Sequence, residues 1–328
     1  MAIEIGTVNA DTSVKLGSTN IQSGYIGFNK FYDSYTSILD LYPSAYHAHS
    51  LRKLKSTYTG KCLRVRRTNS TPNTLTTTVD LDFDVFNTIS LTSKITYVSG
   101  ATTTATNLGQ FCASIINGFS NPDGVNINQS IFVVTWFDQS GNGKNPTQAT
   151  TGSQPRIVDL GNLAMSGGKA AIRFFSANTN FLSLNDTSIP YNNVSSYALG
   201  NAITNTTNIA MLTFGYPASS NLFYLPNATN IGYISGTAFT NNGIVVGQNR
   251  LYELIGGSST TSAYANGTQL TPSTVTSSLL SNTFIRLGTR GSAPAIYLDG
   301  YISEAISFVG TSNRTQIESN INTHYSIW

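Results

Sequence analysis

The second half of the chain is built from short apolar runs separated by Gly, Asn, Ser and Pro. Beyond residue 150, runs such as KAAIRFF, NIAMLTFGY and AIYLDGYISEAISFV follow one another at close intervals. Short runs with such breakers between them are typical of antiparallel sandwiches and jelly rolls. The pair Asn266 and Gly267, between two strand-like runs, predicts a hairpin. We therefore expect a mainly β protein, an antiparallel β-sandwich jelly roll with a few short helices.

The first 150 residues mix helix-like and strand-like patterns. Apolar side chains recur at helical spacing after Ser44, and Gly60 follows them as a helix stop. Elsewhere apolar and polar residues alternate, or a short run is apolar on both faces as in a central buried strand. The expected elements are helices at 44–58, 107–119 and 311–328, and strands at 61–67, 78–86 and 130–137.

Residues 1–40 are polar with scattered aromatic side chains and show no clear period. Such a segment is typical of an extended arm that anchors a subunit, with an edge strand of the main domain as the alternative. Because no linker or internal repeat follows, residues 41–328 are expected to form one sandwich domain.

The composition points to an uncharged polar surface. Charged residues make up 10% of the 328 residues, whereas soluble domains carry about 25%. With 40% hydrophobic residues the chain can bury a core, which excludes disorder. The N-terminus lacks the pattern of a signal peptide, and no run is long enough to span a membrane. Cys62 and Cys112 are expected to be free buried thiols, with a disulfide as the alternative.

A tight loop, FDQSGNGKNP, follows the strand expected at 130–137. Its polar residues match the first positions of a calcium loop, but position 12, which needs Glu, is Ala149. A phosphate loop is also incomplete, because Asn145 and Pro146 follow Lys144. We predict a structural turn and no cofactor, with a weak calcium site at Asp138 as the alternative. The turn residues are Asp138, Ser140, Asn142 and Gly143.

Basic residues gather between positions 52 and 67 and could contact nucleic acid. They are divided between two expected faces, and an acidic strand offers cross-strand partners for Arg64 and Arg66. Internal ion pairing is therefore expected, and no nucleic acid partner. The basic set is Arg52, Lys53, Lys55, Lys61, Arg64, Arg66 and Arg67, and the acidic set is Asp80, Asp82 and Asp84.

Few residues offer catalytic chemistry. His47 and His49 would diverge on a helix, so a shared metal is not expected, and the three histidines form no nucleophile signature. Glycoside hydrolysis needs two carboxylates roughly 5–10 Å apart. The candidates are Asp138, Asp159, Glu253, Asp299 and Glu304.

The stretch between Asp186 and Glu253 contains no carboxylate but many aromatic residues, which could stack on sugars. The ligand-binding candidates are Tyr216, Tyr224, Tyr233 and Tyr252.

AHSLRKLKSTYTGKCLRVRR and TWFDQSGNGKNPTQATTGSQPRIV resemble the catalytic domain of α-L-arabinofuranosidase B. They look closer still to the arabinofuranosidase-like, laminin-G-like modules of tailed-phage virion proteins and bacterial surface proteins. The resemblance is specific between 44 and about 176 and implies a concanavalin-like sandwich. The arabinofuranosidases carry a nucleophilic Glu in mid-domain near a vicinal cysteine pair. The matching region, 208–235, has neither, so no residue here receives that role and no catalytic residue is expected.

These observations predict a non-enzymatic phage virion protein that decorates the capsid or forms part of a head fibre or tail fibre. The expected partners are other virion proteins, further copies of the chain and a weakly bound host-surface glycan, without a membrane. The expected location is the surface of the phage particle. An arabinofuranosidase-like glycoside hydrolase with a relocated carboxylate pair is one alternative. A secreted carbohydrate-binding module or adhesin is the other.

Overall fold

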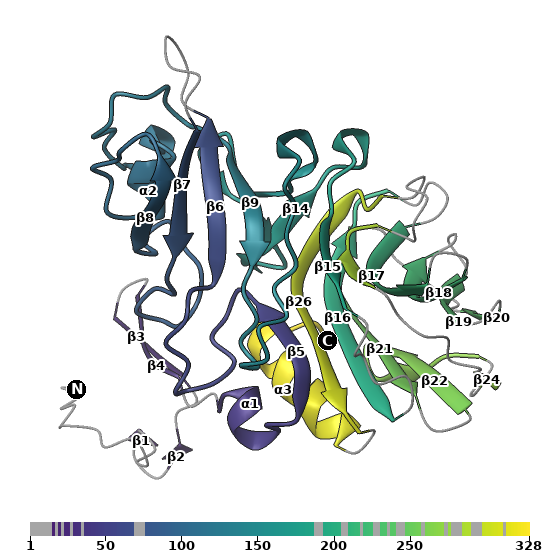
Figure 1. The fold of residues 1–328 in the computed structure, drawn as a ribbon. Helices are drawn as coiled ribbons and strands as arrows, with labels where there is room; N and C mark the ends of the chain where they lie inside the picture. Colours follow the sequence, from purple (N-terminus) through teal and green to yellow (C-terminus); the bar gives the residue numbers. More distant parts are fainter. Residues whose placement is uncertain are drawn as a thin grey trace.

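The computed structural model is a mainly β protein, as the sequence predicts (Figure 1). It describes residues 15–16, 19–20, 23–26, 29–33, 36–68, 76–186, 193–204, 209–216, 219–225, 230–234, 237–240, 247–256, 260–271, 275–276, 284–289, 297–310 and 313–328. Within these ranges no helix is long and apolar enough to cross a membrane.

The larger sheet contains strands from both halves of the chain. Its members are β5 (Ala45–Ser50), β6 (Leu63–Thr68), β7 (Thr76–Leu81), β8 (Ile95–Gly100), β9 (Ile131–Trp136), β10 (Arg156–Asp159), β11 (Asn162–Leu163), β14 (Ile172–Phe174), β16 (Val194–Ala202), β21 (Arg250–Gly256), β22 (Thr260–Ala265), β23 (Thr268–Gln269), β24 (Val275–Thr276) and β26 (Gly300–Val309). The order is β23-β22-β21-β16-β26-β14-β10-β9-β6-β7-β8, with β11 beside β10, β24 beside β22 and β5 beside β26. These pairings are antiparallel.

The second sheet has the order β15-β25-β17-β18-β19-β20 and lies against one part of the larger sheet (Figure 1). Its strands are β15 (Leu182–Asn185), β25 (Phe284–Leu287), β17 (Ile209–Tyr216), β18 (Ser219–Leu225), β19 (Asn230–Ile234) and β20 (Thr237–Thr240). The two-stranded pairs are β1 (Lys15–Leu16) with β2 (Thr19–Asn20), β3 (Ser23–Ile26) with β4 (Asn29–Asp33), and β12 (Met165–Ser166) with β13 (Lys169–Ala170). The helices are α1 (Ile38–Leu41), α2 (Leu108–Phe111), α3 (Arg314–Tyr325) and the 3-10 turns η1 (Ile115–Asn117), η2 (Thr151–Ser153) and η3 (Ser176–Asn178).

Two cores hold these layers together, one on each face of the central strands. Because successive strand residues face opposite sides, Ala305 of β26 packs in the core between the sheets, and Ile306 packs in a second core. The second core includes Ile317 and Ile321 of α3, which recur at helical spacing on its buried face. Strands β16 and β26 are therefore buried on both faces. Helix α3 covers the face that contributes to the second core.

Several local predictions are confirmed. Strands occupy most of 61–67 and 130–137, and a helix closes the chain. Asn266 and Gly267 form the hairpin turn with φ values of 48° and 74°, as a primed turn requires. Cys62 and Cys112 are buried free thiols.

The helix predicted at 44–58 is wrong, because residues 45–50 form strand β5 beside β26. Both faces of β5 are buried, so its sequence lacks the alternation that would have marked a strand. The strand predicted at 78–86 ends at Leu81. Most of the arm predicted for 1–40 lies outside the residues whose side chains are described. Ile38 and Leu39 of α1, however, are buried in the second core.

Candidate functional site

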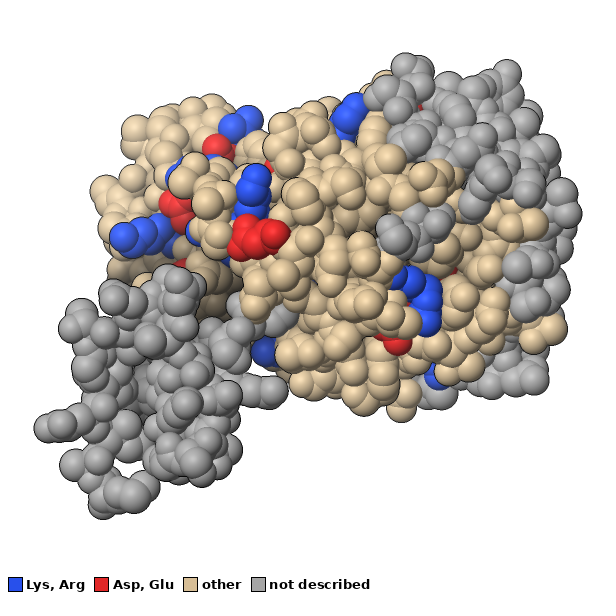
Figure 2. Space-filling view, turned by 90° about the horizontal axis from the view of Figure 1, so that it is seen from below, with Lys and Arg blue, Asp and Glu red and all other residues tan. Residues whose placement is uncertain are grey.

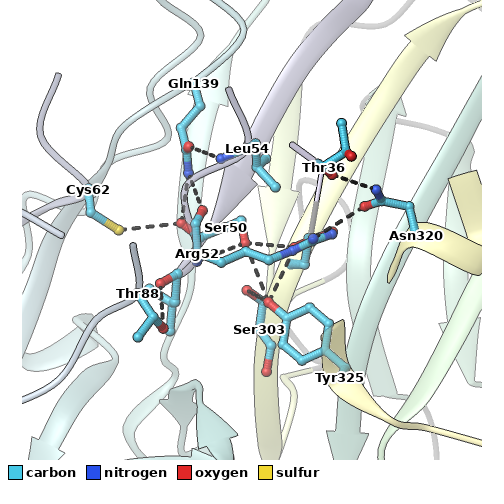
Figure 3. Close-up of polar contacts among 12 residues, drawn as sticks. Thr36, Ser50, Arg52, Leu54, Cys62, Thr88, Gln139, Ser303, Asn320 and Tyr325 are labelled. Carbon is cyan, nitrogen blue, oxygen red and sulfur yellow. Dashed lines mark hydrogen bonds and ion pairs between the residues drawn. The ribbon is translucent and has the colours of Figure 1, made fainter. Parts of the chain in front are cut away.

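Glu304 of β26 is a buried partner of Arg52, not an open carboxylate. Figure 3 shows Arg52 close to Ser50 and Tyr325. The Nε of Arg52 lies 2.7 Å from Oε2 of Glu304, and Nη2 lies 2.8 Å from Oε1. Ser50 donates a hydrogen bond of 2.7 Å to Oε2, and the Tyr325 hydroxyl donates another of 3.2 Å. With both oxygens bonded and α3 above them, Glu304 is held in a structural role.

Glu253 of β21 is also covered by α3, and Nη1 of Arg314 lies 3.0 Å from its Oε2. Burial, together with the nearby Glu318 carboxylate, raises the pKa of Glu253 to about 7. In the strand register Glu253 faces Tyr197 and Glu304 faces Leu199, so their Cα atoms are about 12 Å apart across two strand spacings. The two glutamates therefore do not form a carboxylate pair that a sugar could reach.

Asp138 is the acceptor of the turn after β9. Its Oδ1 accepts from the backbone N–H of Ala48 at 2.8 Å and of Ser140 at 2.9 Å. Its Oδ2 accepts from the Ser140 hydroxyl at 2.7 Å and from the Lys144 N–H at 3.0 Å. Burial acts to raise the pKa of Asp138, but His49 and the donated hydrogen bonds outweigh burial and lower it. The carboxylate is thus occupied by protein donors.

The rest of the loop fits the same arrangement. Asn142 donates to the backbone carbonyls of Ala45 at 2.9 Å and of Tyr46 at 3.1 Å, which ties the turn to β5. Gly143 has a φ of 69°, a conformation that glycine adopts without strain. Among the described residues no group of three or more His, Cys, Asp or Glu side chains could hold a metal ion.

His47 and His49 lie on the same face of β5, because residues two apart on a strand point the same way. Their rings stack with centroids 5.0 Å apart, and both side chains are fully buried. The expectation that they diverge is wrong, since it assumed a helix. Burial lowers the pKa of His47 to about 3 and also lowers the pKa of His49. The stack is therefore uncharged at neutral pH.

Within the described residues, four of the seven basic side chains form ion pairs with carboxylates, as internal pairing predicts. They are Arg52, Lys61, Arg64 and Arg67. Arg64 pairs with its cross-strand partner Asp80 at 2.8 Å, and Lys61 pairs with Asp82 at 2.8 Å. The pairing of Arg66 with the acidic strand is wrong, because Arg66 bonds to the neutral Gln154 side chain. On the face in Figure 2 charged side chains are sparse, and several blue groups adjoin red ones.

The two remaining carboxylate candidates, Asp159 and Asp299, are open to solvent, with side chains 37% and 23% exposed. Asp159 pairs with Arg156, and Asp299 lies 2.6 Å from Nη2 of Arg173. Both guanidinium groups contact the ring of Phe175, with Cζ atoms 4.7 Å and 4.0 Å from its centroid. One aromatic ring thus links two ion pairs, each with an accessible carboxylate.

This arrangement extends over five neighbouring strands as the Arg–aromatic row. Arg173 also contacts the ring of Tyr301 at 5.2 Å, and Arg156 that of Phe132 at 5.4 Å. The alternate residues Ile172 and Ile302 face the core, so the row lies on the outer face of the larger sheet. Each contact contributes roughly 0.5–2 kcal/mol, which favours a rigid face. The row consists of Tyr301, Arg173, Phe175, Arg156, Phe132 and Arg66.

The tyrosines proposed to bind ligand do not gather at the row. Tyr216, Tyr224 and Tyr233 lie on β17, β18 and β19 of the second sheet, and their side chains are outside the described set. Tyr252 is buried in the core between the sheets, so its position does not support stacking on a sugar.

Comparison with solved structures finds the same fold in glycoside hydrolases. A GH54 α-L-arabinofuranosidase soaked with a cyclic sulfate inhibitor matches with a TM-score of 0.51 and 18% identity over 87% of this chain. An arabinofuranosidase complexed with arabinofuranosyl-α-1,2-xylobiose matches with a TM-score of 0.51 and 17% identity, again over 87% of this chain. In both cases the match covers 64% of the other chain. No family model and no curated protein matches the sequence.

The comparison corrects the function expected from the sequence. The expectation of a non-enzymatic virion protein is contradicted, because the two solved structures named above are arabinofuranosidases bound to an inhibitor or a sugar. The part of the resemblance that concerns the arabinofuranosidase fold is confirmed. The identities are low, so the likeness establishes the sandwich architecture, and activity has to be argued from the residues of this chain.

Proposed function

We propose that the chain is an arabinofuranosidase-like glycoside hydrolase. The observation that carries the proposal is that Asp159 and Asp299 are ion-paired but partly exposed carboxylates on one rigid sheet face. In the strand register they lie on opposite sides of the level of Arg156, Arg173 and Tyr301, so their Cα atoms are roughly 16–19 Å apart. They are therefore two alternative candidates for an acting carboxylate and not one pair at roughly 5–10 Å. The shared fold with α-L-arabinofuranosidases supports a furanoside as the first substrate to test.

The acting residues would be aspartates. The nucleophilic Glu of the arabinofuranosidases has no counterpart in 208–235, and Glu253 and Glu304 are covered by α3. Glycoside hydrolases need one carboxyl group to protonate the leaving oxygen and a second to act as nucleophile or base. Asp299 and Asp159 are the members of the original candidate set that a substrate can reach, and each is a candidate for one of these two roles.

The ion pairs give both aspartates a defined orientation. Arg173 is fixed between the rings of Phe175 and Tyr301 while it contacts Asp299. Arg156 is placed in the same way between Phe132 and Phe175. Such support holds a carboxylate in place before substrate binds, which lowers the cost of reaching the reactive geometry.

The activity is tested with the purified full chain and aryl glycosides. We expect release of 4-nitrophenol from 4-nitrophenyl α-L-arabinofuranoside, and less from the β-D-xylopyranoside and the sialoside. The matching sugar test is arabinose release from arabinofuranosyl-α-1,2-xylobiose. Failure to hydrolyse any of these substrates above the buffer rate, by a chain shown to be folded, would contradict the proposal.

A further inference from the structure

A pocket with a volume of about 470 Å³ lies between the loop after β7 and the β11–β12 region. This volume is within the range of about 300–1,000 Å³ typical of small-molecule sites. Its lining residues are Asp84, Phe86, Ser90, Leu91, Thr92, Asn117, Asn162, Leu163 and Met165. None of the five carboxylates considered for hydrolysis lines it.

Two large apolar side chains in the pocket lining are partly exposed to solvent, on a protein whose surface is mostly polar. Phe86 is 44% exposed and Met165 is 48% exposed, and both line the pocket. A partly exposed aromatic ring inside a concave site can pack against the apolar face of a sugar ring.

The polar residues that line the pocket supply both hydrogen-bond donors and hydrogen-bond acceptors. Oδ1 of Asp84 accepts from the backbone N–H of Phe86 at 2.9 Å and of Thr88 at 3.1 Å, which fixes the carboxylate. Within the described part of the chain, no protein donor is recorded for Oδ2 of Asp84. Asn117 donates its Nδ2 to the Ser114 hydroxyl at 2.8 Å and to the Gly161 carbonyl at 3.1 Å, so its Oδ1 is left to accept. Asn162 donates from Nδ2 to the Leu160 carbonyl at 3.5 Å and keeps a second N–H and Oδ1 for a sugar hydroxyl group.

The only charge among the residues that line the pocket is negative. Asp84 is the single ionisable residue among the lining residues, and the set contains no Lys, Arg or His. An acidic sugar would place its carboxylate near Asp84 without a compensating cation, which is unfavourable.

We propose that this pocket binds a short neutral oligosaccharide, with its ring on Phe86 and its hydroxyl groups on Asp84 and Asn162. Neither Asp159 nor Asp299 lines the pocket, although Asn162 is the cross-strand neighbour of Asp159, and the binding proposal does not depend on the role of either aspartate in hydrolysis. It would hold a glycan chain on the protein whether or not the chain cleaves it.

The test is isothermal titration calorimetry with the full chain carrying Asp299→Asn, so that binding is measured without turnover. The neutral probes are arabinotriose and xylobiose, and the acidic probe is galacturonotriose. We expect at least one neutral probe to bind and the acidic probe to bind at least tenfold more weakly. Phe86→Ala and Asn162→Ala should each weaken neutral binding at least tenfold.

Val85→Ala is the matched control, because Val85 is in the same loop, is 86% exposed and does not line the pocket. The Val85→Ala protein should bind the neutral probe with the same affinity as the Asp299→Asn protein from which it is made. Asp84→Asn should reduce the discrimination against galacturonotriose, since the amide keeps an acceptor for the turn but removes the charge. Absence of neutral binding, equal binding of the acidic probe, or full affinity in both Phe86→Ala and Asn162→Ala would overturn the proposal.

Discussion

Arg52 and Glu304 form a bidentate ion pair that is almost completely buried, with side chains 2% and 1% exposed. The pair joins the segment after β5 to β26, and Asn320 of α3 accepts a further hydrogen bond of 3.2 Å from Arg52. Three parts of the chain that are distant in sequence therefore meet at one guanidinium group (Figure 3).

Glu304→Ala should destabilise the protein by about 3–5 kcal/mol, because it leaves the Arg52 cation buried without its carboxylate. The measurement is the free energy of unfolding in urea. Asp80→Ala is the matched control, since it breaks the partly exposed pair with Arg64 and should cost about 1 kcal/mol or less. Equal losses in the two variants would contradict the structural role of Glu304.

Asp138→Ala should also destabilise the fold, by about 2–4 kcal/mol, since the N–H groups of Ala48, Ser140 and Lys144 lose their acceptor. Asp138→Asn keeps one acceptor oxygen and should lose less. The melting temperature of the wild-type chain should be the same in calcium and in EDTA. A clear rise in calcium that disappears in Asp138→Ala would instead identify a metal site.

The buried histidine stack should make the protein sensitive to acid. Burial lowers the folded-state pKa of His47 from 6.5 to about 3, so the folded state favours the neutral ring. This contribution is present above the unfolded pKa of 6.5 and is lost as the pH falls toward 3. The free energy of unfolding should therefore decrease between pH 6.5 and 4. His47→Phe should reduce that decrease, whereas His324→Gln, on the partly exposed side of α3, should leave it unchanged.

Glu253 should give the opposite dependence. Its folded-state pKa is raised from 4.5 to about 7, so its contribution is present below pH 4.5 and is lost as the pH rises through 7. Glu253→Gln removes the charge and should stabilise the chain at pH 8 relative to wild type, by up to about 3 kcal/mol. At pH 4 the two proteins should have similar stability. A Glu253→Gln protein that is less stable than wild type at pH 8 would show that the pair with Arg314 outweighs the burial of charge.

The sequence correctly predicted the features that depend on residues close together along the chain or on one pair of strands. The hairpin at Asn266 and Gly267 follows from turn chemistry, and α3 follows from the spacing of Ile317 and Ile321. The pairing of Arg64 with Asp80 follows from two neighbouring strands with opposite charges. Each of these depends on residues close together in sequence or on one strand pair.

Features that depend on contacts between residues distant in sequence could not be predicted from local sequence patterns. Strand β5 was missed because β26, some 250 residues later, and the second core bury both of its faces. The burial of Glu253 and Glu304 results from the docking of α3. The Arg–aromatic row requires the register of five strands, although the alternation of Arg173 with Ile172 and Phe174 is a local signal for its outward direction.

The most direct test of the proposed hydrolase is kcat/KM for 4-nitrophenyl α-L-arabinofuranoside in Asp299→Asn and in Asp159→Asn. The account predicts a fall of about 10²–10⁴-fold, the usual contribution of a catalytic acid or base, in one of these two variants. Asp82→Asn is the control, because its carboxylate is also ion-paired and partly exposed but lies away from the Arg–aromatic row. It should keep wild-type activity. Wild-type activity in both variants, each shown to be correctly folded, would contradict the account.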